Sequence, residues 1–185
     1  MKFPVNISVP YVHNLEQRGY ADMIEKLVAE QAKANCIKAF HPARSKRSIE
    51  DFSYRGSRTT WYDVKSFDVN SDFSMPNLVS IDRLRKTLAN QHEDIVYILV
   101  HYELDHGAKT VTVKDIEFRA IYEIHPNVLA IQNLGKGVLQ VKNMHNDLEI
   151  YSGGRDNWMK IISAMALDFY DNQIVKFQKL KKTWC

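Results

Sequence analysis

The sequence predicts one α/β domain, spanning residues 1–185, with a mixed central sheet flanked by helices. Two observations lead to this prediction. Helix-like and strand-like segments follow one another in the order helix, strand, strand, helix, strand. The segment 94–103 is a nearly continuous apolar run, which is typical of a central strand covered on both faces. The composition agrees, because 45% apolar and 25% charged residues are ordinary for a soluble globular domain.

A helix and a hairpin open the predicted core. Residues 21–35 carry apolar side chains at helical spacing, and Asn35 is expected to end the helix. Residues 49–54 and 59–67 have the composition of strands and flank a turn at 55–58, which contains a glycine. These two segments are therefore expected to pair as a β-hairpin.

The middle of the chain supplies a second helix and the central strands. A polar loop at 68–75 leads into a predicted helix at 78–90. The cations of this helix are expected to point into solvent: Arg83, Arg85 and Lys86. The central strand follows, and then a further strand at 110–124, in which a break is expected near Lys114 and Asp115.

The C-terminal third predicts a glycine-rich turn, a strand and a long helix. The turn and strand lie within 129–143, and the helix follows Gly153 and Gly154, with Asp156 as its expected N-cap. The apolar residues of this helix fall on more than one face: Trp158, Ile161, Ile162, Met165, Phe169, Ile174 and Phe177. One core contact does not require so many, which makes the helix a candidate subunit interface.

Two acids and a lysine in the predicted hairpin carry the strongest chemical signal. Asp51 lies in one strand and Asp63 in the next. Lys65 shares a side of its strand with Asp63, because strand side chains alternate with period two. Two carboxylates suit Mg²⁺, and a neighbouring ammonium group suits an activated water beside a phosphate. The trio therefore indicates metal-assisted phosphodiester hydrolysis, and a solvated ion pair of Asp63 is the alternative.

Further charged residues flank the trio. Glu25 of the first helix and Glu50, which precedes Asp51, are both candidates for an additional metal ligand, and the sequence does not decide between them. Five cations surround the acids and would either neutralise phosphates or form a solvated loop: Arg44, Lys46, Arg47, Arg55 and Arg58.

Other catalytic chemistries find no support in the sequence. The seven histidines show no metal-binding spacing, no Gly-x-Ser-x-Gly occurs, and the glycines at 135 and 137 do not form a P-loop. The two cysteines, Cys36 and Cys185, build neither a zinc site nor a disulfide framework, which favours a reducing cytoplasm. No signal peptide and no membrane-spanning apolar run are recognisable, so a cytoplasmic protein without membrane association is expected.

Several segments resemble, in order, the type II restriction endonucleases of the EcoRV and HincII group, within the PD-(D/E)xK nuclease superfamily. The resemblance covers most of the chain and rests on these segments: Ile24-Glu25-Lys26-Leu27-Val28, Asp63-Val64-Lys65, Ser74-Met75-Pro76-Asn77-Leu78-Val79-Ser80, Ile131 to Gln140, and the helix from Trp158. It implies a restriction-endonuclease-like core, whose order of elements is the one predicted above.

The resemblance also implies a function. A homodimer would cut both strands of double-stranded DNA at a short palindromic site, and the host would hold a cognate DNA methyltransferase. Asp51, Asp63 and the Val64 carbonyl would bind Mg²⁺, and Lys65 would orient or deprotonate the attacking water. A related nicking or repair nuclease and a non-catalytic DNA-binding module on the same fold are the alternatives.

Residues for reading DNA follow from the same resemblance. The implied contacts to bases or backbone come from two segments: Ser74, Met75, Asn77, Asn133, Gly135, Lys136, Gly137 and Gln140. Accessory roles fall to Glu25, Arg44 and Arg47. Met75 and Lys136 depart from the small side chains of the family, and base recognition depends on a few side chains. The recognised sequence and the cut position therefore stay open.

Overall fold

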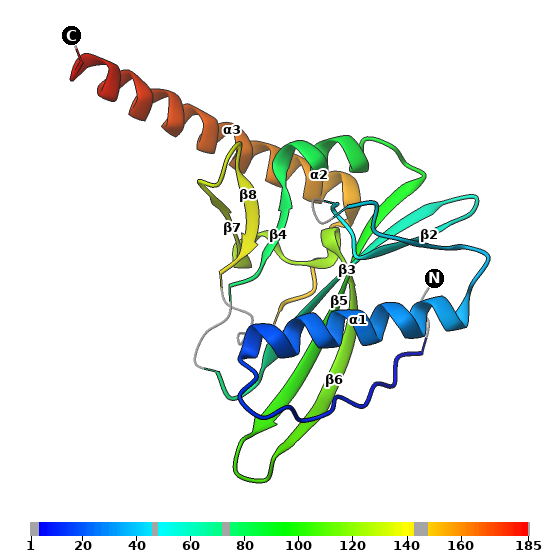
Figure 1. Cartoon of the computed structure of the whole chain (residues 1–185). Helices are drawn as coiled ribbons and strands as arrows, with labels where there is room; N and C mark the ends of the chain where they lie inside the picture. Colours follow the sequence, from blue (N-terminus) through cyan, green and yellow to red (C-terminus); the bar gives the residue numbers. More distant parts are fainter. Residues whose placement is uncertain (1–3, 46–47, 72–74, 143–147, 185) are drawn as a thin grey trace.

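The computed structural model describes residues 4–45, 48–71, 75–142 and 148–184 (Figure 1). A five-stranded sheet forms its centre, in the order β1-β2-β3-β5-β6. β3 and β5 run parallel, and every other neighbouring pair is antiparallel, so the sheet is mixed as predicted. The elements of this layer are α1 (Gln17–Asn35), β1 (Phe40–Pro42), β2 (Phe52–Arg55), β3 (Thr59–Asp68), β5 (Glu93–Asp105) and β6 (Thr110–Ala120).

A smaller antiparallel sheet of order β4-β8-β7 lies beside α2 and α3. Its elements and the helices around it are β4 (Asn77–Ser80), α2 (Ile81–Leu88), the 3-10 turns η1 (Ile121–Glu123) and η2 (Pro126–Val128), β7 (Leu129–Gln132), β8 (Val138–Val141) and α3 (Gly154–Lys182). No helix among the described residues is long and apolar enough to cross a membrane.

The two faces of the central sheet pack against different partners. Tyr62 and Val64 of β3 belong to the core that α1 covers through Ile24 and Val28. Phe67 belongs to the opposite core, which α2, α3 and the smaller sheet complete. Because strand side chains alternate, Asp63 and Lys65 lie on the Phe67 side of β3. The sheet thus directs both residues away from α1 and toward the smaller sheet.

Most predicted elements are confirmed. The hairpin forms between β2 and β3, the first helix ends at Asn35 but begins at Gln17, and the apolar strand is β5. The expected break in β6 is a β-bulge: Asp115 pairs with His101 and Val113 pairs with Tyr102, which leaves one residue unpaired between them.

Two boundaries predicted from the sequence are wrong. The segment 78–80 is not helical, because β4 pairs there with β8 and buries Leu78 and Val79. Asp156 is not the N-cap, since Gly153 takes that place and α3 begins at Gly154. The guanidinium of Arg155 fixes this start by donating to four oxygen atoms of residues 88–94.

Candidate active site

Asp63 and Lys65 form a tight ion pair on β3. The Lys65 Nζ atom lies 2.9 Å from Oδ1 of Asp63 and 2.8 Å from Oδ2. Asp63 is only 7% exposed, and a buried carboxylate is stable only when it is paired. The ammonium group thus sits where a cation is needed to balance this carboxylate.

The β2–β3 hairpin brings Asp51 to the same place. Asp51 directly precedes β2, and its amide donates to the Tyr62 carbonyl at 2.8 Å. Its carboxylate accepts a hydrogen bond from the Val64 amide, with 2.6 Å between Oδ2 and N. The two acids and the lysine that the sequence singled out are therefore neighbours.

Glu25, and not Glu50, adjoins this trio. Burial and the charge of Asp51 raise the pKa of Glu25 to about 7. Although Glu25 is exposed as a whole residue, its carboxyl group lies against that of Asp51. Glu50 is buried, and the charged side chains that act on it are Arg44 and Arg55. Of the two glutamates, Glu25 is thus the one whose carboxyl group lies near the trio.

The close packing of acidic side chains favours binding of a cation at this site. Burial and the charge of Asp51 raise the pKa of Asp63 while Lys65 lowers it, and the net effect is a pKa of about 7. Among the described residues, Lys65 is the cation whose charge acts on both Glu25 and Asp63, which lie beside the third carboxyl group, that of Asp51. A divalent cation would supply further positive charge, and carboxylate oxygens such as those of Asp51 and Asp63 are the hard ligands that Mg²⁺ prefers.

The hydroxyl group of Tyr97 points to the same conclusion. Tyr97 lies opposite Asp63 in the parallel β3–β5 pair and is fully buried. Its Oη atom has no hydrogen-bond partner among the residues that the structure describes. Burial raises the Tyr97 pKa well above its usual value, and the charges of Asp63 and Asp51 add to this effect. A hydrated Mg²⁺ ion would offer this hydroxyl a bound water as its partner, so the residues present fit the ion.

A pocket of about 370 Å³ gives access to Asp63 and Lys65. Ser80 at the end of β4 and Arg83 of α2 line it on the side of the smaller sheet. Arg83 is exposed, as expected, but it faces this pocket, which the sequence did not indicate. Position 83 directly precedes the buried Leu84, so it lies at the margin of the packed face of α2.

A larger pocket of about 620 Å³ lies at the start of α3 and has a different character. Two arginines line it, Arg58 and Arg155, and both already pair with Asp94. None of the three carboxyl groups near Lys65 lines this pocket. We therefore place the candidate active site in the smaller pocket.

The residues expected to read DNA fall into two groups. Asn77 and Gln140 are register partners in β4 and β8, and the Gln140 amide donates to the Asn77 side chain at 3.1 Å and to the Met75 carbonyl at 3.0 Å. Asn77 therefore begins a strand and not, as expected, a helix. Ser74 and Arg47 lie outside the described residues.

The second group forms the β7–β8 turn. Asn133 and Lys136 are exposed there, and the Lys136 carbonyl accepts a hydrogen bond from Tyr170 at 3.0 Å. Gly135 and Gly137 have positive φ angles of 58° and 98°. A Cβ atom at Gly137 would lie 2.9 Å from Ile81, so close packing requires glycine there.

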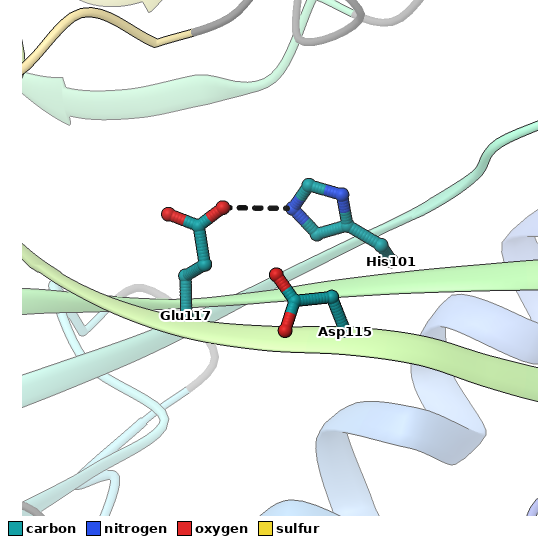
Figure 2. Close-up of side chains that lie close together, drawn as sticks. All are labelled: His101, Asp115 and Glu117. Carbon is teal, nitrogen blue, oxygen red and sulfur yellow. Dashed lines mark ion pairs between the residues drawn. The ribbon is translucent and has the colours of Figure 1, made fainter.

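A cluster that the sequence did not reveal lies on β5 and β6. His101, Asp115 and Glu117 offer ligand atoms that are all within 4.8 Å of one another. Figure 2 shows the three side chains turned toward a common point, with His101 on one strand and both acids on the other. The predicted break near Asp115 was the only sequence signal at this position.

No protein-family model matches this chain, and no curated protein resembles it at a significant level. Function must therefore be argued from the geometry of the site.

Proposed function

We propose that the chain is a type II site-specific deoxyribonuclease that hydrolyses phosphodiester bonds of double-stranded DNA with the help of Mg²⁺. The observation that carries this proposal is the meeting of Asp51, Asp63 and Lys65 beside an accessible pocket. The order α1, β2–β3 hairpin, α2 and then β5 parallel to β3 supports it, because this is the order implied for a restriction-endonuclease-like core.

The proposed roles follow from the contacts of each side chain. Asp51 and Asp63, with the Val64 carbonyl, would hold Mg²⁺, and the bound ion would supply Lewis-acid polarisation of the phosphate and a lower pKa for water. Binding of the metal ion would release Lys65 from the Asp63 carboxylate, because the charge of the ion would then balance this carboxylate in place of the ammonium group. Its ammonium group would then be free to orient the attacking water by donating a hydrogen bond to it, and as the neutral amine Lys65 would accept the proton that this water loses. Glu25, whose carboxyl group lies beside that of Asp51, would help to hold the attacking water.

Arg83 and the polar group of the smaller sheet supply the DNA contacts in this proposal. No hydrogen bond or ion pair of Arg83 occurs within the described part of the chain, so its guanidinium is available to a phosphate at the mouth of the pocket. Asn77, held by Gln140, and the exposed turn with Asn133 and Lys136 would meet base edges or backbone.

The C-terminal part of α3 favours assembly into a homodimer. It extends away from the rest of the molecule in Figure 1. Apolar side chains there and just after the helix end remain uncovered, and we call them the α3 stripe: Ile174, Phe177, Leu180 and Trp184. Exposed apolar side chains that lie together are typical of protein interfaces. A palindromic DNA site has two-fold symmetry, which a homodimer with two-fold symmetry matches. Such an enzyme would act in the cytoplasm beside a host methyltransferase that protects the same site.

The test is incubation of the full chain with a sequenced circular plasmid and Mg²⁺, followed by mapping of the ends. The proposal expects discrete double-strand breaks and no cleavage by Asp63→Asn, which should still bind duplex DNA in Ca²⁺ and melt as a folded protein. The matched control is Asp68→Asn, a buried acid on the same strand that lies outside the pocket. Cleavage by Asp63→Asn at the wild-type rate would refute the assignment. Single-strand nicks would indicate the nicking alternative, and binding without cutting would indicate a DNA-binding module.

A further inference from the structure

We propose that His101, Asp115 and Glu117 form a second metal site, which binds a divalent transition-metal ion of the Zn²⁺ type. The three ligand atoms lie within 4.8 Å of one another and come from neighbouring strands (Figure 2). This proposal concerns residues outside the candidate active site and does not depend on the nuclease function.

The β-bulge in β6 is what assembles the cluster. Before the bulge, Val111 and Val113 pack on the side of the sheet that α1 covers, and after it Ile116 and Phe118 do so. The alternation of the strand therefore changes parity between 113 and 116. Because of this change, Asp115 lies opposite His101 and on the same face of the sheet. In an unbroken strand, Asp115 would lie on the same face as Val113, toward α1 and away from His101.

Neighbouring side chains hold the ligands in position. The ring of Phe67 lies 4.2 Å from the imidazole of His101, centre to centre. Arg119 pairs with Oε2 of Glu117, which leaves Oε1 directed at Nε2 of His101. These two atoms are 3.8 Å apart, too far for a hydrogen bond. Two ligands that each lie about 2.0–2.2 Å from one zinc ion can be separated by nearly this distance.

One imidazole and two carboxylates indicate which class of metal ion this site would bind. Imidazole nitrogen suits Zn²⁺ and its neighbours in the first transition row, whereas Mg²⁺ prefers oxygen ligands alone. Two carboxylates and one imidazole supply three protein ligands, so a tetrahedral ion keeps one position for water. Asp115 is exposed, which leaves the site open to an ion from solution. The bound ion would link β5 to β6 across the bulge.

The experiment titrates Zn²⁺ into the chelator-treated full chain by calorimetry, with Mg²⁺ in excess to fill the candidate active site. Asp115→Asn and His101→Gln should each weaken Zn²⁺ binding at least about tenfold, a loss that even outer-shell partners of a metal produce. They should also remove the rise in melting temperature that Zn²⁺ causes. Co²⁺ in place of Zn²⁺ should give visible absorption bands of a tetrahedral ion in the wild type, and these should vanish in both variants.

Two controls separate this site from the others. Glu103→Gln removes the same charge from β5, where Glu103 pairs with Lys114 outside the cluster, and should leave Zn²⁺ affinity unchanged. Asp63→Asn should also leave it unchanged, since that residue belongs to the candidate active site. Zn²⁺ binding that survives Asp115→Asn and His101→Gln, or that disappears in Asp63→Asn, would overturn the proposal. So would the lack of any saturable Zn²⁺ binding by the wild type.

Discussion

At the scale of single residues, the hydroxyl group of Tyr97 stands out. The group is buried beside Asp63 and has no partner among the described residues. An unsatisfied buried polar group costs about 1–3 kcal/mol of folding free energy. A water bound to a metal ion would donate a hydrogen bond to this oxygen, so under the proposed function we expect Tyr97 to couple folding stability to metal binding.

We therefore expect Tyr97→Phe to change stability and metal response in opposite directions. The metal-free variant should melt at the same temperature as the wild type or higher, because the unpaired hydroxyl group is gone. The rise in melting temperature caused by Mg²⁺ should become smaller, because a partner of the bound water is lost. Differential scanning fluorimetry with and without Mg²⁺ measures both quantities.

The matched control is Tyr20→Phe. Tyr20 is equally buried, but its hydroxyl group bonds the Val12 amide at 3.0 Å and the Val12 carbonyl at 2.9 Å. This variant should melt lower by the equivalent of about 1–3 kcal/mol and keep the full Mg²⁺ response. If Tyr97→Phe behaves like Tyr20→Phe, the Tyr97 hydroxyl group has no role at the metal site.

Asp63 makes metal-free stability depend on pH. Its pKa is about 7 in the folded protein, compared with 3.8 for the free side chain. The folded state therefore holds a proton that the unfolded state has lost between these values, and stability falls as pH rises from about 4 to about 7. Metal binding should strengthen over the upper part of this range, because the carboxyl groups must first lose their protons.

The pH prediction is checked by urea unfolding of the chelator-treated protein at several pH values. The wild type should lose stability between pH 4 and pH 7, and Asp63→Asn should show a smaller loss because the amide does not titrate. Calorimetric titration of Ca²⁺ should give tighter binding at pH 8 than at pH 6. A wild-type stability that rises between pH 4 and pH 7 would contradict the assigned direction of the Asp63 pKa.

At the scale of elements, the first half of α3 packs into the core and its second half exposes apolar side chains. Its first half buries Trp158, whose indole donates to the Ile124 carbonyl at 2.7 Å, together with Ile162 and Ala166. Its second half leaves Phe177 63% exposed and Ile174 52% exposed. The sequence predicted apolar residues on more than one face, and the burial divides them along the length of the helix.

Phe177→Asp should weaken dimer formation without unfolding the subunit. A charge in the α3 stripe would have to be desolvated in the interface, whereas in the subunit this position is exposed to water. Sedimentation equilibrium should show a dimer for the wild type and a monomer for the variant at the same concentration. Lys179→Asp, two residues further along the same helix and on its opposite side, should remain dimeric. A wild-type monomer at all concentrations would exclude the α3 stripe as a subunit interface.

For the whole molecule, the proposed dimer holds one complete site in each subunit. Asp51, Asp63 and Lys65 all come from one chain, and none of their contacts requires a partner. Each subunit should therefore cut one strand.

This arrangement predicts the product of mixed dimers. Dimers of one wild-type subunit and one Asp63→Asn subunit, purified with two different affinity tags, should convert a supercoiled plasmid to a nicked circle at the recognised site. Wild-type dimers should give linear DNA, and Asp63→Asn dimers should leave the plasmid intact. Linear product from the mixed dimer at the wild-type rate would mean that a single site cuts both strands.

Much of the architecture could be predicted because it is encoded locally. Helical spacing around Ile24 placed α1, and the apolar run at 94–103 placed β5. Period-two alternation placed Lys65 beside Asp63, and the short hairpin turn brought Asp51 to them. The segment 78–80 escaped prediction, because its apolar residues suit a helix and only pairing with β8 made it a strand.

The sequence by itself determined the α/β class, the hairpin and the trio of Asp51, Asp63 and Lys65, because each depends on residues close together in the chain. The tertiary structure decided what surrounds them. Tyr97 reaches Asp63 through the parallel register of β3 and β5, and Glu25 reaches Asp51 through the packing of α1. The cluster of His101, Asp115 and Glu117 exists only because a bulge shifts the register of β6. Strand register depends on contacts along the whole sheet, which no local pattern contains.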